Sequence, residues 1–174
     1  MEIERKFLVR DAHLRDIPGL QLLEIKSTYL DIPKLMDHGA SLGIILGEES
    51  GPREIRVSKV THEEQVEYWM TVKVGGATLS RAESASKLDE ATYNKVVKNF
   101  GESSLSKKRF KFNYLRKTFE LDVIPDARMM ILEIELDTEK QPFVVPPFVN
   151  IIREVTGEKK FYSANIASAL TLRS

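Results

Sequence analysis

The sequence predicts an α+β fold made mainly of antiparallel β-strands, and three features of the chain support this class. Polar and apolar residues alternate with period two in several segments, beginning with residues 2–9. Two pairs of such segments, 53–60 with 66–74 and 106–114 with 117–124, are separated by short polar turns, which predicts two hairpins. Apolar residues recur at the spacing of an α-helix in only a few short stretches. The expected architecture is therefore a sheet with a few flanking helices.

The first strand separates charged from apolar residues. Successive side chains of a strand point to opposite faces, so Glu2, Glu4 and Lys6 share one face. Ile3 and Phe7 lie on the other face. The chain thus begins with a strand that has one charged and one apolar side.

Glycine and proline mark the connections that follow. A short strand at 27–30 precedes a long excursion, 33–51, whose Gly, Ser and Pro residues interrupt any regular pattern apart from a turn of helix. Gly75 and Gly76 end the first hairpin. A further strand is expected at 79–85.

Two helices and one more strand complete the chain. Apolar residues between Leu88 and Phe100 approximate a helical stripe, with Ser86 available as the N-cap and Gly101 as the terminator. Residues 129–136 alternate as a strand with Glu133 and Glu135 on one face, and residues 163–172 are expected to form the last helix.

Composition limits the class of protein. The 174 residues suffice for one domain with its own core, so we expect a single domain over 1–174. Lys and Arg together number 26, as do Asp and Glu, and this balance gives no reason to propose a nucleic-acid or membrane partner. The chain has no cysteine and no apolar run of membrane-spanning length, so a cytoplasmic protein is expected, with a homodimer left open.

The charged residues gather on a few strand faces. Carboxylates pair at a spacing of two residues as Glu2/Glu4, Glu120/Asp122 and Glu133/Glu135. Cations on comparable faces are Lys6, Arg53 or Arg56, Lys59, Lys73, Arg81, Lys107 and Arg109. A sheet with one buried and one solvated face would explain any single strand of this kind. A sheet closed into a barrel would instead turn the charged face into an interior that requires a ligand.

Carboxylate pairs beside many cations suit an anionic substrate that arrives with a metal ion. Carboxylate oxygens select hard cations such as Mg²⁺ or Mn²⁺, which bridge to phosphate oxygens. Arg and Lys neutralise the remaining phosphate charge. The chemistry indicated is phosphoryl transfer.

The opening EIERK resembles the ExExK signature of the CYTH superfamily, also called triphosphate tunnel metalloenzymes. Further segments resemble that family in order over nearly the whole chain: TYL, EIRV, MTVK, LSRAE, KKRF, FELDV, LEIEL and REVTGEKKFYSANIA. The resemblance implies a closed eight-stranded β-barrel, or tunnel, with a polar interior and a few flanking helices. It also implies a metal-dependent triphosphatase.

The resemblance implies a role for each matching residue. The implied metal ligands are Glu2, Glu4, Asp122, Glu133 and Glu135. The implied triphosphate-binding residues are Lys6, Arg56, Lys73, Arg81, Lys107 and Arg109. The implied catalytic residues are Lys73, Tyr29 and Glu4, with a lysine of lowered pKa helping to activate a water.

The chain departs from the family pattern in three places. Relatives often carry Arg-x-Arg where this chain has Arg56, Val57 and Ser58, so one cation is missing from the expected face. Ala85 stands where a second carboxylate often follows Glu83, and the excursion is longer than in compact relatives. These departures concern substrate choice and rate more than the fold.

The expected function is hydrolysis of a triphosphate with Mg²⁺ or Mn²⁺. Inorganic tripolyphosphate is the preferred substrate because no nucleobase or thiamine pocket is evident in the sequence. The alternatives are a thiamine or nucleoside triphosphatase, a class IV-type adenylyl cyclase, and a non-catalytic module that binds polyphosphate.

Overall fold

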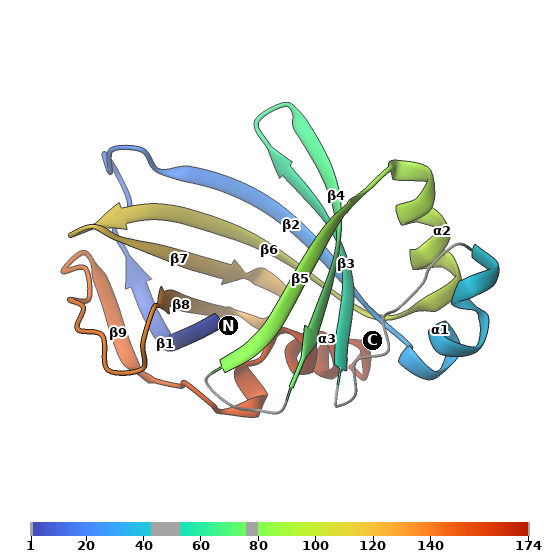
Figure 1. Cartoon of the computed structure of the whole chain (residues 1–174). Coiled ribbons are helices and arrows are strands. Elements are labelled where there is room, and N and C mark those ends of the chain that lie inside the picture. The colour runs from blue at the N-terminus through green and yellow to red at the C-terminus, as the bar shows by residue number, and fades with distance from the viewer. Residues whose placement is uncertain (1, 43–52, 76–79, 174) are drawn as a thin grey trace.

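Nine strands and three α-helices form the part of the chain that the computed structural model describes, residues 2–42, 53–75 and 80–173 (Figure 1). The strands are β1 (Glu2–Ala12), β2 (Gln21–Leu30), β3 (Arg53–His62), β4 (Gln65–Val74), β5 (Ser80–Leu88), β6 (Gly101–Tyr114), β7 (Lys117–Ile124), β8 (Met129–Leu136) and β9 (Val149–Glu154). The helices are α1 (Ile32–His38), α2 (Glu90–Phe100) and α3 (Ser163–Thr171), with 3₁₀ turns η1 (Gly39–Leu42), η2 (Pro125–Ala127) and η3 (Lys159–Phe161).

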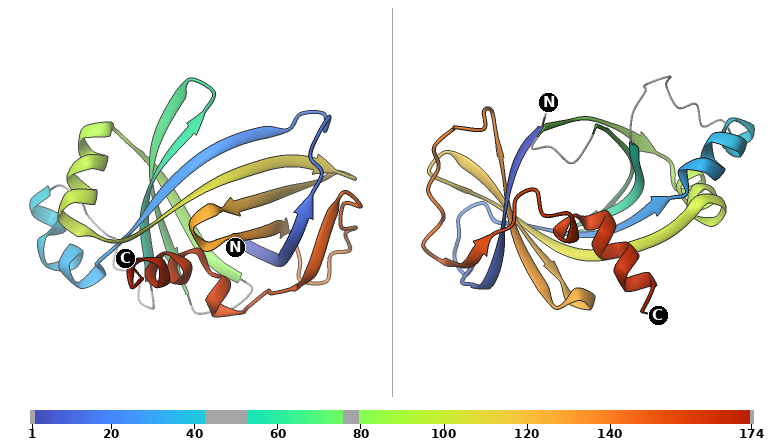
Figure 2. Two further views of the ribbon diagram at one scale, coloured as in Figure 1. Left: turned by 180° about the vertical axis from the view of Figure 1, so that it is seen from behind. Right: turned by 90° about the horizontal axis from the view of Figure 1, so that it is seen from below.

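All nine strands belong to one strongly curved antiparallel sheet in the order β5-β4-β3-β2-β6-β7-β8-β1-β9 (Figure 2). The mainly antiparallel class with a few helices is therefore as predicted. The predicted closed eight-stranded barrel is wrong, because the sheet is open. β9 extends it beyond β1, and β5 meets β1 through only two residue pairs, Glu2 with Arg81 and Ile3 with Ser80. By contrast, β1 and β8 pair at seven positions, from Ile3 to Val9 on β1.

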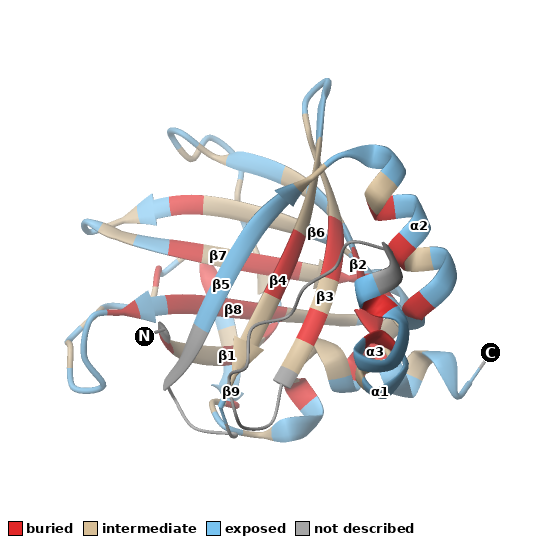
Figure 3. Cartoon of the chain, turned by 45° about the vertical axis from the view of Figure 1, so that its right-hand side comes forward, coloured by how far each residue is buried: buried red, intermediate tan, exposed pale blue. Residues whose placement is uncertain are grey.

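The two faces of the sheet differ in character, as the alternation predicted. We call the face that carries Lys6, Asp122 and Glu133 the inner face, and the opposite face, which carries Phe7 and Phe119, the outer face. Burial of residues on both faces is visible along β7 and β8, whereas β5 is exposed over most of its length (Figure 3). The apolar core of this sheet thus lies mainly outside its curve.

Chain segments and helices cover the outer face. Phe143 and Phe148, from the segment between β8 and β9, pack on a cluster in which the rings of Phe112 and Phe119 stack at 5.9 Å between centroids. The helices α1 and α2 cover β2, β3 and β4 through a second cluster, whose buried members are Leu30, Leu35, Ile55, Val57, Met70, Tyr93, Val96 and Phe100.

The helix α3 packs instead on the inner face, at one end of it. Its Ile166 and Ala167 contact Tyr29, Leu105 and Ile131, which are apolar or aromatic residues in otherwise polar strand positions. α3 therefore bounds the polar part of the inner face. No helix in the described ranges is long and apolar enough to cross a membrane.

Most expected elements are present, with differences at their ends. The helix α2 begins after Asp89, whose side chain accepts a hydrogen bond from the amide of Thr92, so the predicted N-cap Ser86 is wrong. Ser86 belongs to β5, which runs on to Leu88. The terminator Gly101 is confirmed as the C-cap.

The prediction from sequence alternation made two strands too short and missed a third. β2 and β6 begin earlier than expected, and β9 was not predicted because prolines directly precede it. Within the excursion, residues 32–38 form α1, while residues 43–52 lie outside the described part.

Replacing Phe119 with Ala tests whether the outer face holds the fold together. Phe119 is fully buried, so the substitution leaves a cavity and should lower the free energy of unfolding by about 3–5 kcal/mol. Urea denaturation measures this loss. Leu172→Ala, at a side chain that is 86% exposed, is the control and should change stability by less than about 0.5 kcal/mol. Equal small effects of both would contradict the assignment of the core.

Candidate functional site

Strand register brings the predicted site residues of four strands onto the inner face. Arg109 of β6 lies directly opposite Asp122 of β7. Glu120 of β7 lies opposite Glu133 of β8, which in turn lies opposite Lys6 of β1. Directly paired residues of an antiparallel sheet share a face, so these side chains converge.

Arg109 stands at the centre of this group. Its Nε and Nη2 donate to the two oxygens of Asp122 at 2.7 and 2.8 Å, and Nη2 also donates to Glu133 at 2.9 Å. Its Nη1 donates to Glu120. A planar guanidinium can serve several carboxylates at once because its donors are held in a rigid fork.

Two lysines complete the network. Lys6 donates to Glu133 at 2.5 Å and lies 3.2 Å from Glu4, and Lys107 donates to Asp122. Asp122 and Glu133 are only 2% and 7% exposed, so their charges are tolerable only because they are paired. We call Glu4, Lys6, Lys107, Arg109, Glu120, Asp122 and Glu133 the charge cluster.

Burial and neighbouring charges together shift the pKa values of the most buried residues of the cluster. Burial alone would raise the pKa of Glu133, but Lys6 and Arg109 outweigh it and hold that pKa well below its ordinary value. Burial, assisted by Arg109, lowers the pKa of Lys107 against the opposing effect of Asp122. The cluster thus holds a carboxylate that stays ionised beside a lysine whose charge is destabilised.

Glu4 is the carboxylate of the cluster whose negative charge is least compensated by nearby cations. Burial and the neighbouring Glu133 carboxylate raise the pKa of Glu4 to about 7, against the opposing effects of Lys6 and Lys73. Lys73 belongs to β4, so a cation from the first hairpin also acts on this carboxylate of β1.

The Glu4 and Glu133 carboxylates are the donors that fit a divalent cation best. Glu133 stays ionised and its charge disfavours ionisation of Glu4, so Mg²⁺ or Mn²⁺ would relieve the repulsion between the two carboxylates. Mg²⁺ is often held by one or two carboxylates plus substrate phosphates. Among the described residues, however, no group of three or more acidic or histidine side chains is arranged to hold a metal ion. The protein part of such a site is therefore incomplete within the described residues.

The other predicted site residues are spread along β2 to β5. Tyr29, Arg56, Thr71 and Ala85 follow one another across these strands in register. Lys73 lies one inner-face position further and pairs with Glu83 at 2.8 Å. This row forms the wall of the inner face that lies across from the charge cluster.

The position of the missing cation holds a hydroxyl pair. Ser58 is buried, and its Oγ lies 2.8 Å from that of Ser27 on the adjacent strand. Trp69 lies opposite Ser58 on β4 and lines the same small cavity, so it faces the inner side. This part of the inner face is polar but uncharged.

The structure therefore brings together six of the predicted residues, namely Glu4, Lys6, Lys107, Arg109, Asp122 and Glu133. Glu135 lies opposite Glu4 on β8 but is exposed. The side chains of Glu2 and Arg81 lie outside the described residues. The roles assigned to all of these residues stay predictions.

Two contributors were missed at the level of sequence. Glu120 was recognised as half of a carboxylate pair, but only the register shows that it binds Arg109. Ser163 at the start of α3 lines the inner cavity, and no spacing signal in the sequence connects this helix with the strands.

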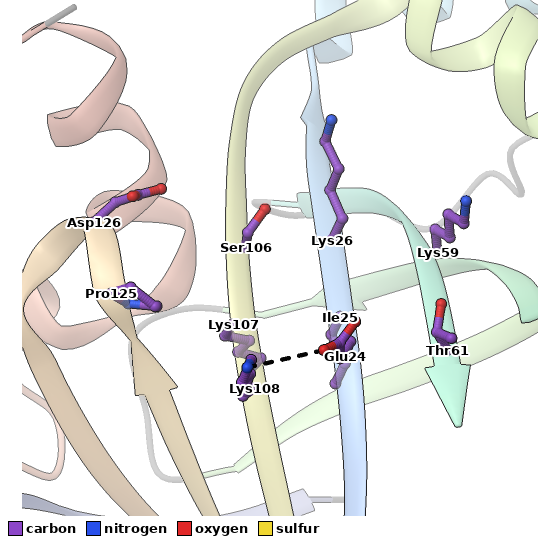
Figure 4. Close-up of a pocket in the computed structure, with 10 residues that line it drawn as sticks. All are labelled: Glu24, Ile25, Lys26, Lys59, Thr61, Ser106, Lys107, Lys108, Pro125 and Asp126. Carbon is purple, nitrogen blue, oxygen red and sulfur yellow. Dashed lines mark ion pairs between the residues drawn. The ribbon is translucent and has the colours of Figure 1, made fainter. Parts of the chain in front are cut away.

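A groove of about 420 Å³ between β2, β3, β6 and η2 is a poorer candidate (Figure 4). Of the residues to which the family resemblance assigns a role, it contains only Lys107, which is already paired with Asp122. Its Lys108 makes an exposed ion pair with Glu24 at 4.0 Å. We therefore place the candidate site on the inner face.

Two of the known proteins to which the chain is similar are named inorganic triphosphatases. No protein-family model matches the chain. The chain is similar to an inorganic triphosphatase from Acetivibrio thermocellus, with 29% identity over 101 residues. That match covers 56% of this chain and 64% of the relative, so it spans less than two thirds of the relative's length.

Solved structures agree over more of the chain. The structure of the inorganic triphosphatase NE1496 is 26% identical with a TM-score of 0.57, covering 96% of this chain and 94% of that one. The PH1819 protein from Pyrococcus horikoshii OT3 has a TM-score of 0.59 over 80% of each chain, and at 17% identity it shows a shared fold alone.

Asp122→Asn tests the charge cluster. The substitution removes the buried counter-charge of Lys107 and Arg109, and it should lower the free energy of unfolding by about 3–5 kcal/mol. The control Glu24→Gln removes an exposed ion pair to Lys108, which lies on β6 as Lys107 and Arg109 do. It should lower the free energy of unfolding, measured by urea denaturation for both variants, by less than about 1 kcal/mol. A loss no larger than that of the control would show that the buried pairing contributes little.

Glu4 should titrate near neutral pH in the metal-free protein. The folded state binds its proton more tightly than the unfolded state, where the ordinary pKa of 4.5 applies. This contribution to stability is therefore present below about pH 4.5 and is lost as the pH rises toward 7. Carboxyl ¹³C shifts should show a midpoint of about 7, and Glu133→Gln should lower it. A wild-type midpoint at the ordinary value would contradict the proximity of the two carboxylates.

Proposed function

We propose that the chain is a member of the CYTH superfamily, the triphosphate tunnel metalloenzymes, and that it is an enzyme that hydrolyses a triphosphate on its inner face. The observation that carries this proposal is the charge cluster, in which buried lysine and arginine side chains are neutralised by carboxylates. The relatives named inorganic triphosphatase support the choice of substrate class.

The cations of the cluster are bound to carboxylates. We propose that phosphate oxygens replace some of these partners, with Arg109 binding them through its fork and Lys6 and Lys107 acting as point charges. The exchange keeps the buried cations paired at every stage, which avoids the cost of an isolated buried charge.

The released carboxylates are the proposed holders of a divalent cation. Glu4 and Glu133 would provide oxygen ligands, with Glu2, Asp122 and Glu135 as the further candidates implied by the family pattern. When bound, the cation would neutralise the phosphate chain and polarise the phosphorus under attack. The choice between Mg²⁺ and Mn²⁺ is open.

The proposed reaction is hydrolysis at the terminal phosphorus. A water oxygen forms a bond to that phosphorus as the bond to the bridging oxygen breaks, which gives orthophosphate and pyrophosphate from tripolyphosphate, and the proton that the water loses passes to solvent. The ion pair with Glu83 favours the ammonium form of Lys73. For this reason we propose that Lys73 binds phosphate rather than removing the proton of the water.

Inorganic tripolyphosphate is the substrate that we favour. The inner cavity beside Arg56 measures about 150 Å³, which suits a phosphate group better than a nucleoside or a thiamine. A triphosphate is the only partner that the proposal requires. The single-domain organisation, the cytoplasmic location and the open question of a homodimer remain predictions.

Parallel assays of phosphate release test the proposal. Tripolyphosphate, ATP and thiamine triphosphate are each supplied with Mg²⁺, Mn²⁺ or EDTA, and we expect metal-dependent release from tripolyphosphate. Glu4→Gln should reduce kcat at least about 100-fold, because a neutral amide is a poor ligand for a divalent cation. The control Glu24→Gln lies away from the cluster and should retain the wild-type rate.

Other results of the same assay would select another function. Pyrophosphate and cyclic nucleotide from ATP would indicate a cyclase. Binding of tripolyphosphate without turnover of any substrate would indicate a non-catalytic module, and Ser58 in place of a cation is the feature of this chain that would favour it.

A further inference from the structure

The strand β5 lies at one end of the sheet, and most of its outer edge has no neighbouring strand in the described part of the chain. Over residues 82–88 it pairs with β4 at seven consecutive positions. On its other side it meets β1 only at Ser80 and Arg81, because β1 turns away to pair with β8 and β9. Figure 3 shows that β5 is exposed over most of its length.

An edge of this kind can accept a further antiparallel strand. Alternate backbone groups of an edge strand point away from the sheet and are available for hydrogen bonding. Proline, a β-bulge or large side chains can prevent such pairing, but residues 82–88 contain no proline and pair with β4 without a bulge. Ser84, Ala85 and Ser86 at the middle of the edge are small and exposed. The edge of β5 is therefore accessible and regular.

The other end strand, β9, is better protected. Two register shifts interrupt its pairing with β1, and prolines directly precede it. Its charged residues are already bound, since Arg153 donates to Glu158 at 3.0 Å and Glu154 accepts from Arg5 at 2.6 Å. Irregular pairing of this kind discourages the addition of a strand. Of the two ends of the sheet, β5 is the better candidate for an interface.

The sequence of the β5 edge, AESASKL at 82–88, is complementary to itself. In an antiparallel pair of two copies centred on Ala85, Glu83 of each copy lies opposite Lys87 of the other. Ser84 lies opposite Ser86, and Ala85 lies opposite itself without bringing like charges together. A two-fold axis through Ala85 and perpendicular to the sheet generates this pairing, and it keeps residues of the same face opposite one another.

The neighbouring registers are less favourable. A shift by one residue would place the two faces of the sheet out of phase, so the smallest permitted shift is two residues. Such a shift shortens the paired stretch from the seven residues of 82–88 to five and separates Glu83 from Lys87 of the second copy. The register centred on Ala85 is thus the one that uses the whole edge and both pairs of opposite charges.

Charges on β4 extend this complementarity. Glu83 pairs with Lys73 at 2.8 Å, and Lys87 pairs with Glu67 at 2.6 Å. The side chains of Glu83 and Lys87 remain 29% and 59% exposed, so each can contact a second opposite charge. In the pair of copies, Glu83 would lie between Lys73 of its own chain and Lys87 of the second copy. Charges of alternating sign on adjacent strands stabilise a sheet.

We propose that the edge of β5 is a homodimer interface, in which two copies of this chain pair antiparallel through residues 82–88 with Ala85 at the two-fold axis. The sheet of one copy then continues into the sheet of the other. Both copies use the same edge, so this contact closes at two copies and does not grow into a filament. The homodimer that the sequence left open thereby receives a specific interface.

Charge reversal tests the pairing of Glu83 with Lys87. The variants Glu83→Lys and Lys87→Glu each bring like charges together in their own homodimer, and each should raise the dimer dissociation constant at least about tenfold. An equimolar mixture of the two variants restores opposite charges at both places and should dimerise at least about tenfold more tightly than either variant alone. Sedimentation velocity on the full chain measures these constants. Lys26→Glu, at an exposed position of β2, is the control and should leave the constant unchanged.

A single introduced cysteine tests the register, because the chain has no cysteine of its own. Ala85→Cys places two thiols opposite each other across the axis, where paired Cβ atoms are about 4.5–5.5 Å apart and a disulfide can form with a small adjustment. Ser84→Cys is the matched control, since Ser84 would lie opposite Ser86 and not opposite itself. With copper phenanthroline as the oxidant, we expect a covalent dimer from Ala85→Cys and little from Ser84→Cys.

The outcomes decide the proposal without reference to catalysis. A wild-type chain that stays monomeric at its highest soluble concentration overturns it, as does a dimer that neither folded charge-reversal variant weakens. Faster crosslinking of Ser84→Cys than of Ala85→Cys also overturns it. Recovery in the mixture together with crosslinking through Ala85→Cys supports it. Circular dichroism confirms folding, and if a charge-reversal variant does not fold, the cysteine variants still decide.

Discussion

The pairing of Arg109 with Asp122, Glu133 and Glu120 is the interaction on which the inner face depends. These groups are largely removed from water, where an uncompensated charge would be costly. The pairing links β6, β7 and β8, and Lys6 extends it to β1. The charges of the cluster can be buried because each of them lies beside an opposite charge.

A sheet with charges on its inner face must obtain its hydrophobic stabilisation elsewhere. In this chain the outer face provides it, and the helices α1 and α2 and the segment before β9 serve as covers for apolar strand residues. This arrangement separates the tasks of the two faces. Residues such as Phe119 and Leu132 stabilise the fold without contacting the site, while Lys107 and Arg109 form the site on the alternate positions of the same sheet.

The alternation of polar and apolar residues predicted which side chains share a face of the sheet, but it did not predict that the sheet is open. The period-two pattern of residues 2–9 and 129–136 correctly separated Glu4, Lys6 and Glu133 from the apolar core, because side-chain direction in a strand is a local property. Whether a sheet closes depends on its two end strands, and no local pattern reports the two-residue contact of β5 with β1 or the addition of β9. The network around Arg109 depends on register between strands, and the part played by Ser163 depends on where a distant helix packs. Both are properties of the tertiary fold.

The short seam between β1 and β5 has a mechanical consequence. Only two residue pairs join these strands, and in the described part of the chain no hydrophobic cluster contains residues of both. Separating the seam would break a few backbone hydrogen bonds, each worth about 1 kcal/mol net. The wall formed by β3, β4 and β5 is therefore attached firmly along β2 and weakly along β1. The inner face is therefore held by an extended strand pairing along one margin and by two residue pairs along the other.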